Sequence, residues 1–143
     1  MENTEVINVT RCLIMTMFVY TAGHKLLDLE GFKLSLTRQV FPLYLQPIIL
    51  LAVPASELAT VILLAYSKTR FMGFLLSTIL MVAFTIYVSG ALLHLYPNTP
   101  CSCGGVLSKM SWKTHLIFNL CFLVFSVFGL SSLIKERRAA ENK

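Results

Sequence analysis

The sequence predicts an all-α membrane protein in which four transmembrane helices form one antiparallel bundle. The first observation is composition: of 143 residues, 56% are hydrophobic and 13% are charged, about half the charged fraction of an ordinary soluble domain. The second is a set of four apolar runs, each close to the roughly 20 residues that a helix needs to cross a bilayer. These runs lack the two-residue alternation of barrel strands, so helices are the structure that satisfies their backbone in lipid.

The four predicted helices span about residues 6–28, 45–66, 71–96 and 115–134, in a single domain that covers the whole chain. The first is expected to remain uncleaved, because acidic residues precede it and Thr21-Ala22-Gly23 is a poor match to a signal-peptidase site. Lys68-Thr69-Arg70 separates the second helix from the third, and Lys135-Glu136-Arg137-Arg138 closes the fourth. A loop of residues 97–114 joins the third and fourth helices.

The connection between the first and second helices has a pattern of its own. Phe32, Leu36, Val40 and Leu43 recur at helical spacing, which predicts a short helix at about residues 32–43 that lies in the membrane interface. Apolar residues also alternate at the beginning of this segment, which leaves an extended start open.

Lysine and arginine counts orient the bundle, because loops rich in these residues stay in the cytoplasm. Four spans place both termini and the 68–70 loop on one side of the membrane. That side carries seven lysines and arginines, and the other side carries five. We therefore predict cytoplasmic termini and an outward-facing 97–114 loop in an oxidising compartment. The net charge of +5 is interpreted as membrane anchoring, and the absence of a nucleic-acid motif or aromatic–basic stripe argues against a nucleic-acid partner.

Cys101 and Cys103 stand one residue apart in this loop, directly before Gly104 and Gly105. Neighbouring Cα atoms are about 3.8 Å apart, and a disulfide needs roughly 4.4–6.8 Å between its Cα atoms. A bond between the two cysteines therefore requires a bend at Ser102 and closes a small, strained ring. Such disulfides tend to be oxidising and catalytic, and a ring this small contributes little as a structural clip. The glycines allow a tight turn whose N–H groups could face a sulfur atom.

Positive charge is also expected near these thiols. Lys109 and Lys113 follow them, and the fourth helix begins nearby with Ser111 or Thr114 as its cap. Lysines and a helix N-terminus both favour the reactive thiolate form of cysteine.

A metal site is the alternative use of the same loop. His94 and His115 flank it, and with Cys101 and Cys103 they would make a Cys2His2 ligand set. The Cys-x-Cys spacing alone is not a strong zinc signal, and histidines at helix ends are commonly polar end residues.

Glu57 lies about twelve residues into the second predicted helix, near the middle of the membrane. A charged side chain at this depth costs about 2.5–3.5 kcal/mol on insertion scales, so it marks a site of interest. It could pair with Lys25 or with His24, and Tyr20 lies four residues before His24 on the same face. The carboxylate could serve as a polar latch between helices, as a proton relay, or as part of a site for a quinone head group.

Three motifs resemble those of the MauE/DoxX-like family of four-helix, redox-associated membrane proteins. They are Tyr20-x-x-Gly23-x-Lys25-Leu26-x-Asp28, Pro54-x-x-Glu57 and Pro100-Cys-x-Cys-Gly-Gly, of which the last is the most distinctive. The resemblance implies a multi-pass protein of the bacterial inner (cytoplasmic) membrane with a periplasmic cysteine loop. In that family, MauE is associated with methylamine utilisation and with a thioredoxin-like partner in disulfide formation.

The expected function is thiol–disulfide exchange in the membrane, as a possible disulfide oxidoreductase. Cys101 or Cys103 would exchange with a thioredoxin-like or secreted partner, the other cysteine would resolve the mixed disulfide, and electrons could pass to a quinone. Two alternatives remain open: a non-catalytic membrane subunit or scaffold in an oligomer or larger complex, and a Cys/His metal-binding membrane protein.

Overall fold

The computed structural model describes residues 2–95 and 111–141, and in these ranges all regular structure is helical. The helices are α1 (Glu2–Leu27), α2 (Leu29–Thr37), α3 (Gln46–Ala65), α4 (Arg70–Leu92) and α6 (Trp112–Glu141). Within the described ranges, α1, α3, α4 and α6 are the helices that are long and apolar enough to cross a membrane. The predicted all-α class with four spanning helices is confirmed.

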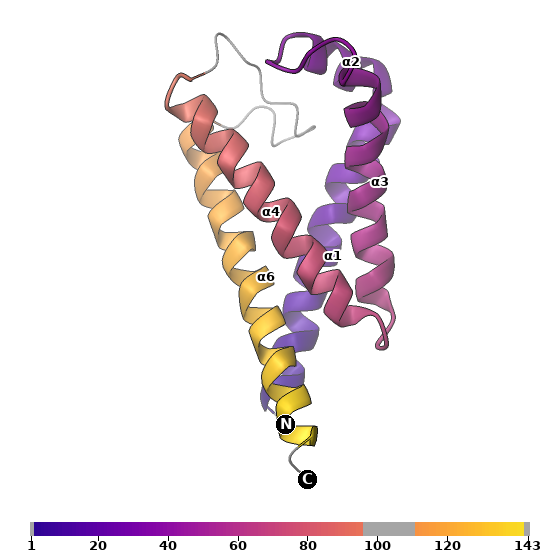
Figure 1. Ribbon diagram of the computed structural model, residues 1–143, viewed down its shortest axis with the longest axis vertical. Coiled ribbons are helices and arrows are strands. Elements are labelled where there is room, and N and C mark those ends of the chain that lie inside the picture. The colour runs from indigo at the N-terminus through magenta and orange to yellow at the C-terminus, as the bar shows by residue number, and fades with distance from the viewer. Residues whose placement is uncertain (1, 96–110, 142–143) are drawn as a thin grey trace.

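The spanning helices associate mainly as two pairs, in which α1 packs on α3 and α4 packs on α6. Figure 1 shows the pairs close together at the end that carries both chain termini and further apart toward the end where α2 lies. Both termini therefore lie at the same end of the bundle, and the last described residues after α4 and before α6 lie at the opposite end.

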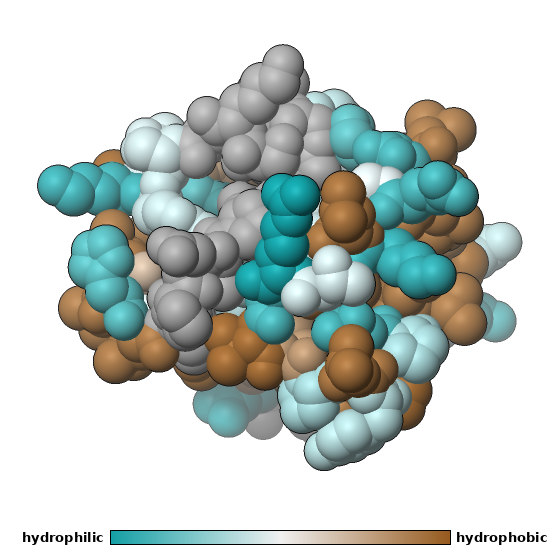
Figure 2. Space-filling model, turned by 90° about the horizontal axis from the view of Figure 1, so that it is seen from above, coloured by the Kyte–Doolittle hydropathy of each residue, from teal (hydrophilic) through white to brown (hydrophobic). Residues whose placement is uncertain are grey.

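The core that holds the pairs together is apolar and draws on every spanning helix. Its buried members are Ile7, Ile14, Met17, Phe18, Leu64, Phe74, Met81 and Leu133. Large apolar side chains also cover the outside of the bundle, as expected of helices that face lipid. Seen from the α2 end, hydrophilic residues are interspersed with hydrophobic ones, as at a membrane–water boundary (Figure 2).

Small residues let α4 approach its neighbours closely. A Cβ atom added at Gly129 of α6 would collide with the ring of Phe74, and one added at Gly73 would come within 2.8 Å of the backbone nitrogen of Leu64. The hydroxyl of Ser77 donates a hydrogen bond to Ser126 across the α4–α6 contact at 2.8 Å, with both side chains buried. Close approach between helices is what stabilises their association in lipid, where the hydrophobic effect does not act between helices.

Four segments have bounds that differ by several residues from the expected ones. The first is α1, which begins at Glu2 instead of about residue 6. The third spanning helix ends at Leu92 instead of near residue 96, because His94 adopts φ 55° and the N–H of Leu95 donates to the carbonyl of Gly90 at 3.1 Å. This is a Schellman turn with histidine at the left-handed position that glycine usually takes. The short helix after α1 occupies 29–37 instead of 32–43, since Asp28 accepts a hydrogen bond from the N–H of Gly31 at 3.0 Å and sets its start.

The last helix is longer at both ends than the expected 115–134. Ser111 precedes it and accepts a hydrogen bond from the N–H of Thr114 at 3.3 Å, which satisfies one of the first-turn donors. At the other end the charged residues continue the helix, because lysine, glutamate and arginine have good helix propensity. Two contacts with α4 hold this extension: Arg70 pairs with Glu136 at 3.4 Å, and the Arg137 guanidinium lies 4.6 Å from the centre of the Phe71 ring.

Candidate functional site

A cavity of about 430 Å³ lies between the two helix pairs, in the half of the bundle nearer to α2. Its walls are mostly apolar and include Phe32, Leu36, Phe41, Met81, Phe84 and Phe118. A smaller set of polar side chains also reaches it: Thr21, Lys25, Gln39, Glu57, Tyr87, His115 and Asn119. Apolar walls with a few convergent polar groups are typical of sites that bind small molecules, whose volumes range from about 300 to 1,000 Å³.

A buried ion pair forms one side of the pocket. The Nζ atom of Lys25 lies 2.7 Å from Oε1 of Glu57, and the two side chains are 6% and 1% exposed. Two opposite charges in contact neutralise each other, which makes their burial in the bilayer tolerable. The pair also joins α1 to α3. The second carboxylate oxygen, Oε2, is buried and has no hydrogen-bond partner among the described residues.

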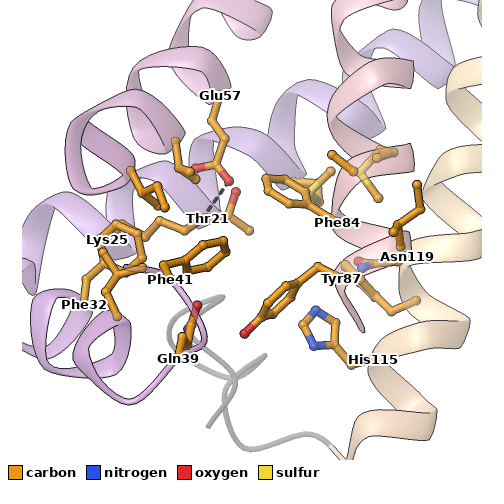
Figure 3. Close-up of a pocket in the computed structure, with 18 residues that line it drawn as sticks. Thr21, Lys25, Phe32, Gln39, Phe41, Glu57, Phe84, Tyr87, His115 and Asn119 are labelled. Atoms are coloured by element: carbon orange, nitrogen blue, oxygen red, sulfur yellow. Dashed lines mark hydrogen bonds and ion pairs between the residues drawn. The ribbon is translucent and has the colours of Figure 1, made fainter. Parts of the chain in front are cut away.

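The other side of the pocket is built by α4 and α6. Figure 3 shows Tyr87, His115 and Asn119 facing the ion pair across the cavity. His115 and Asn119 are four residues apart on α6, so they share one face of the helix, and both are buried, at 1% and 4% exposure. The Nδ2 donor of Asn119 is buried without a hydrogen-bond partner in the described part of the chain.

Aromatic contacts position two of these side chains. The ring of Tyr87 stacks on that of Phe41, with centroids 5.8 Å apart and planes 17° apart. The imidazole of His115 stacks on Trp112, with a centroid distance of 6.5 Å and an angle of 20°. Phe41 belongs to the segment between α2 and α3, so this segment closes the α2 end of the pocket.

Of the two candidate partners for Glu57, the structure brings Lys25 into contact. His24 and Tyr20 lie on another face of α1, where their rings are 6.4 Å apart, and neither lines the pocket. The turn of the helix explains this: Thr21 and Lys25, four residues apart, face inward, so the residues directly before them, Tyr20 and His24, are rotated by about 100° toward the outside.

The predicted cysteine site falls on residues that the structure does not describe. Cys101, Cys103, Gly104 and Gly105 lie outside the described residues. Of the flanking histidines, His115 is buried in the pocket, whereas His94 is exposed and does not line it. In ranges 2–95 and 111–141, no three histidine, cysteine, aspartate or glutamate side chains are grouped so that they could hold a metal ion.

Four polar pocket residues were not foreseen from the sequence: Thr21, Gln39, Tyr87 and Asn119. A signal for Asn119 was present, because His115 and Asn119 repeat at a helical spacing of four in an otherwise apolar run. Charged residues inside spanning helices attract attention because they are costly there. An uncharged amide inside a spanning helix is also a polar group in an apolar environment, so it likewise indicates a position that faces the interior of the bundle.

Comparison with known proteins identifies one family. The sequence model of a family described as "Methylamine utilisation protein MauE" matches residues 3–132, a range that contains all of α3 and α4 and most of α1 and α6. Neither the curated proteins nor the solved structures gave a match.

Proposed function

Because the chain belongs to the MauE family, we propose that it is a membrane thiol–disulfide exchange protein whose reactive groups are Cys101 and Cys103. The observation that carries this proposal is the position at which the chain connects the pair to the bundle. Leu95 is the last described residue before the pair, and Ser111 is the first after it. They lie next to the ends of α4 and α6 that contribute Tyr87 and His115 to the buried polar pocket.

The chemistry follows from the spacing of the thiols. The thiolate of one cysteine attacks a disulfide of the partner, forms a mixed disulfide and releases one partner thiolate. The second cysteine then attacks the mixed disulfide, which leaves a Cys101–Cys103 disulfide and a partner with two thiols. The reverse sequence introduces a disulfide into the partner and leaves both cysteines reduced, so the same residues serve either direction.

The proposed partner is a thioredoxin-like or secreted protein with cysteines, which meets the loop on the periplasmic side of the bacterial inner membrane. Lys113, which is exposed in the first turn of α6, and the N-terminus of that helix supply positive charge on the loop side of the bundle. Both favour a thiolate nearby. Cys103 is proposed as the attacking residue because Gly104 and Gly105 directly follow it and can offer backbone N–H donors.

Trapping of the mixed disulfide tests this function. We expect Cys101→Ser to accumulate a covalent adduct with a thioredoxin-like protein, because no resolving thiol remains, and Cys103→Ser to accumulate none. The adduct is detected as a band on a non-reducing gel that disappears on reduction. Cys121→Ser, which changes an exposed cysteine on α6, is the matched control and should behave as the unchanged protein.

The opposite trapping pattern would exchange the two roles and leave the mechanism intact. If neither variant traps a partner, the exchange function is wrong. If both variants also release a bound metal, the loop is a Cys/His metal site.

A further inference from the structure

We propose that the pocket between the helix pairs binds the ring of a membrane-soluble quinone or of its quinol. The use of this ligand as an electron acceptor rests on the proposed thiol–disulfide exchange, whereas its binding rests on the pocket alone. Three properties of the pocket lead to this ligand: its charge balance, its two unpaired polar atoms and its contact with the lipid-facing surface.

Charge balance indicates a neutral ligand. Among the described residues that line the pocket, the lysine and carboxylate side chains are Lys25 and Glu57, and they neutralise each other at a distance of 2.7 Å. An anion or a cation bound there would disturb this pair and would have to be desolvated in a largely apolar cavity, which is costly. A neutral molecule with polar atoms at defined positions meets neither obstacle.

The unpaired atoms indicate what the ligand must offer. Glu57 Oε2 is an acceptor and Asn119 Nδ2 is a donor, both are buried without a partner among the described residues, and they belong to opposite sides of the pocket. Buried polar atoms are rarely left unpaired, so a ligand that satisfies both is favoured. A quinol does this, because one of its two opposed oxygens can accept from Asn119 while the other hydroxyl donates to Glu57. A quinone carbonyl accepts from Asn119 in the same way, but a quinone has no donor for Glu57, so the unpaired atoms favour the quinol.

The shape and position of the walls favour a flat, lipid-soluble molecule. Phe41, Phe84, Tyr87 and Phe118 surround the cavity with aromatic rings, which pack well against a planar ring by stacking or by edge-to-face contact. Ile86 of α4 also lines the pocket although its side chain is 65% exposed. The pocket thus reaches the lipid-facing surface of the bundle, which is the side from which a quinone with an isoprenoid tail would arrive.

Electrons and protons balance if this ligand serves the cysteine pair. Oxidation of the two thiols to one disulfide forms an S–S bond and releases two electrons and two protons. Reduction of one quinone to its quinol takes up two electrons and two protons. One quinone is therefore consumed for each Cys101–Cys103 disulfide formed, and no other oxidant is needed.

Trp112 provides a direct readout of binding because it is the only tryptophan in the chain and its ring stacks on His115 of the pocket. The protein with Cys101→Ser and Cys103→Ser, purified in detergent, is titrated with decylubiquinone. We expect saturable quenching of the Trp112 fluorescence. Asn119→Leu should weaken binding about tenfold, since the loss of a hydrogen bond at a buried site has this order of magnitude. Ala83→Phe, which places bulk in the pocket lining, should abolish binding.

Cys121→Ser, two residues beyond Asn119 and exposed, is the matched control and should bind as the parent does. Circular dichroism confirms that each variant retains its helices, so a loss of binding reports on the pocket. Non-saturable quenching, or equal affinity in the parent and in Asn119→Leu, would overturn the proposal. Displacement of the quinone by dodecane at similar concentrations would do the same, because the pocket would then hold acyl chains. Since the parent in this assay lacks both loop cysteines, a failure of thiol–disulfide exchange leaves its outcome unaffected.

Discussion

Lys25 and Glu57 illustrate at the level of single residues how a spanning bundle tolerates charge. Each side chain alone would be a costly ion in the bilayer. Together they form a contact of 2.7 Å between α1 and α3, with almost no solvent exposure. A pair of this kind need not increase stability relative to apolar side chains, but the removal of one member leaves an uncompensated charge. The pair therefore makes the α1–α3 contact specific.

Removal of one charge should be more damaging than removal of both. We expect Lys25→Met to lower the free energy of unfolding by about 3–5 kcal/mol, because Glu57 is left buried without a counter-charge. Lys25→Met combined with Glu57→Met should recover most of this loss. Lys33→Met, at an exposed position on α2, is the control. Thermal unfolding in detergent measures all three, and equal melting of Lys25→Met and Lys33→Met would argue against a structural role for the ion pair.

Glu57→Gln separates a structural from a proton-transferring role. The amide keeps the shape of the side chain and can still accept a hydrogen bond from Lys25. Stability should fall because Lys25 loses its counter-charge, but the protein should still insert, fold and form its Cys101–Cys103 disulfide. The amide cannot hold and deliver a proton to the quinone that is being reduced, so turnover with decylubiquinone should fall. Turnover is measured as the rate of decylubiquinone reduction, and disulfide formation is measured by thiol alkylation. Unchanged turnover would rule out the proton relay and leave the carboxylate as a latch.

At the scale of helices, contact between α4 and its neighbours depends on small residues. Gly73 lies against Leu64 of α3, Gly129 lies against Phe74 of α4, and the Ser77–Ser126 hydrogen bond joins α4 to α6. These contacts lie in the half of the bundle away from the pocket, where the pairs are close together (Figure 1). Tight packing at one end and aromatic walls at the other leave room for the cavity.

Alanine at two glycines should have opposite effects. At Gly129 the added methyl group meets the Phe74 ring, so we expect a loss of about 1–3 kcal/mol in stability, typical of overpacking. At Gly23 nothing lies within 4 Å of the added Cβ, so alanine should be neutral or stabilise α1 by up to about 1 kcal/mol. Unfolding of both variants in the same detergent gives the comparison. Equal stability of the two would show that α4 and α6 are not in close contact at Gly129.

At the scale of the whole molecule, orientation determines which compartment the cysteine loop meets. In the described part of the chain, four helices are long and apolar enough to span the membrane. They bring the termini to one end and the α4 and α6 ends that flank the loop to the other (Figure 1). The lysine and arginine count favours cytoplasmic termini, with seven residues against five. The loop would then meet the oxidising side, where disulfide chemistry is used.

Labelling in intact cells tests this orientation. A membrane-impermeant maleimide added from outside should label Cys103 after mild reduction. Cys12 and Cys121 should remain unlabelled, because they are exposed on the outer faces of spanning helices, where lipid surrounds them. Variants that retain a single cysteine allow the labelling of each cysteine to be measured separately. Labelling of Cys103 only after the membrane has been opened would reverse the orientation and remove the support for an oxidising environment.

The sequence alone was sufficient for the class of fold and for the number of spanning helices. Both depend on the length and hydrophobicity of contiguous runs, which are local properties of the chain. The positions of the helix ends were predicted less accurately, because they depend on individual hydrogen bonds. The turn at His94, with its φ of 55°, shortens α4 at a residue whose type does not announce a helix end. The unusual position of Glu57 could also be recognised, since charge in an apolar run is visible without a structure.

The pocket itself could be seen only once the helices were packed. Lys25 and His24 are equivalent candidates in sequence, and the rotation of α1 against α3 selects Lys25 as the partner of Glu57. Asn119 faces this pair because α6 packs on α4 and the two helix pairs diverge toward α2. The physical reason is that a spanning helix is apolar on every side, because it contacts lipid as well as other helices. The pattern of hydrophobic residues therefore does not predict which face packs against the other helices. That choice is made by close packing between side chains far apart in the chain.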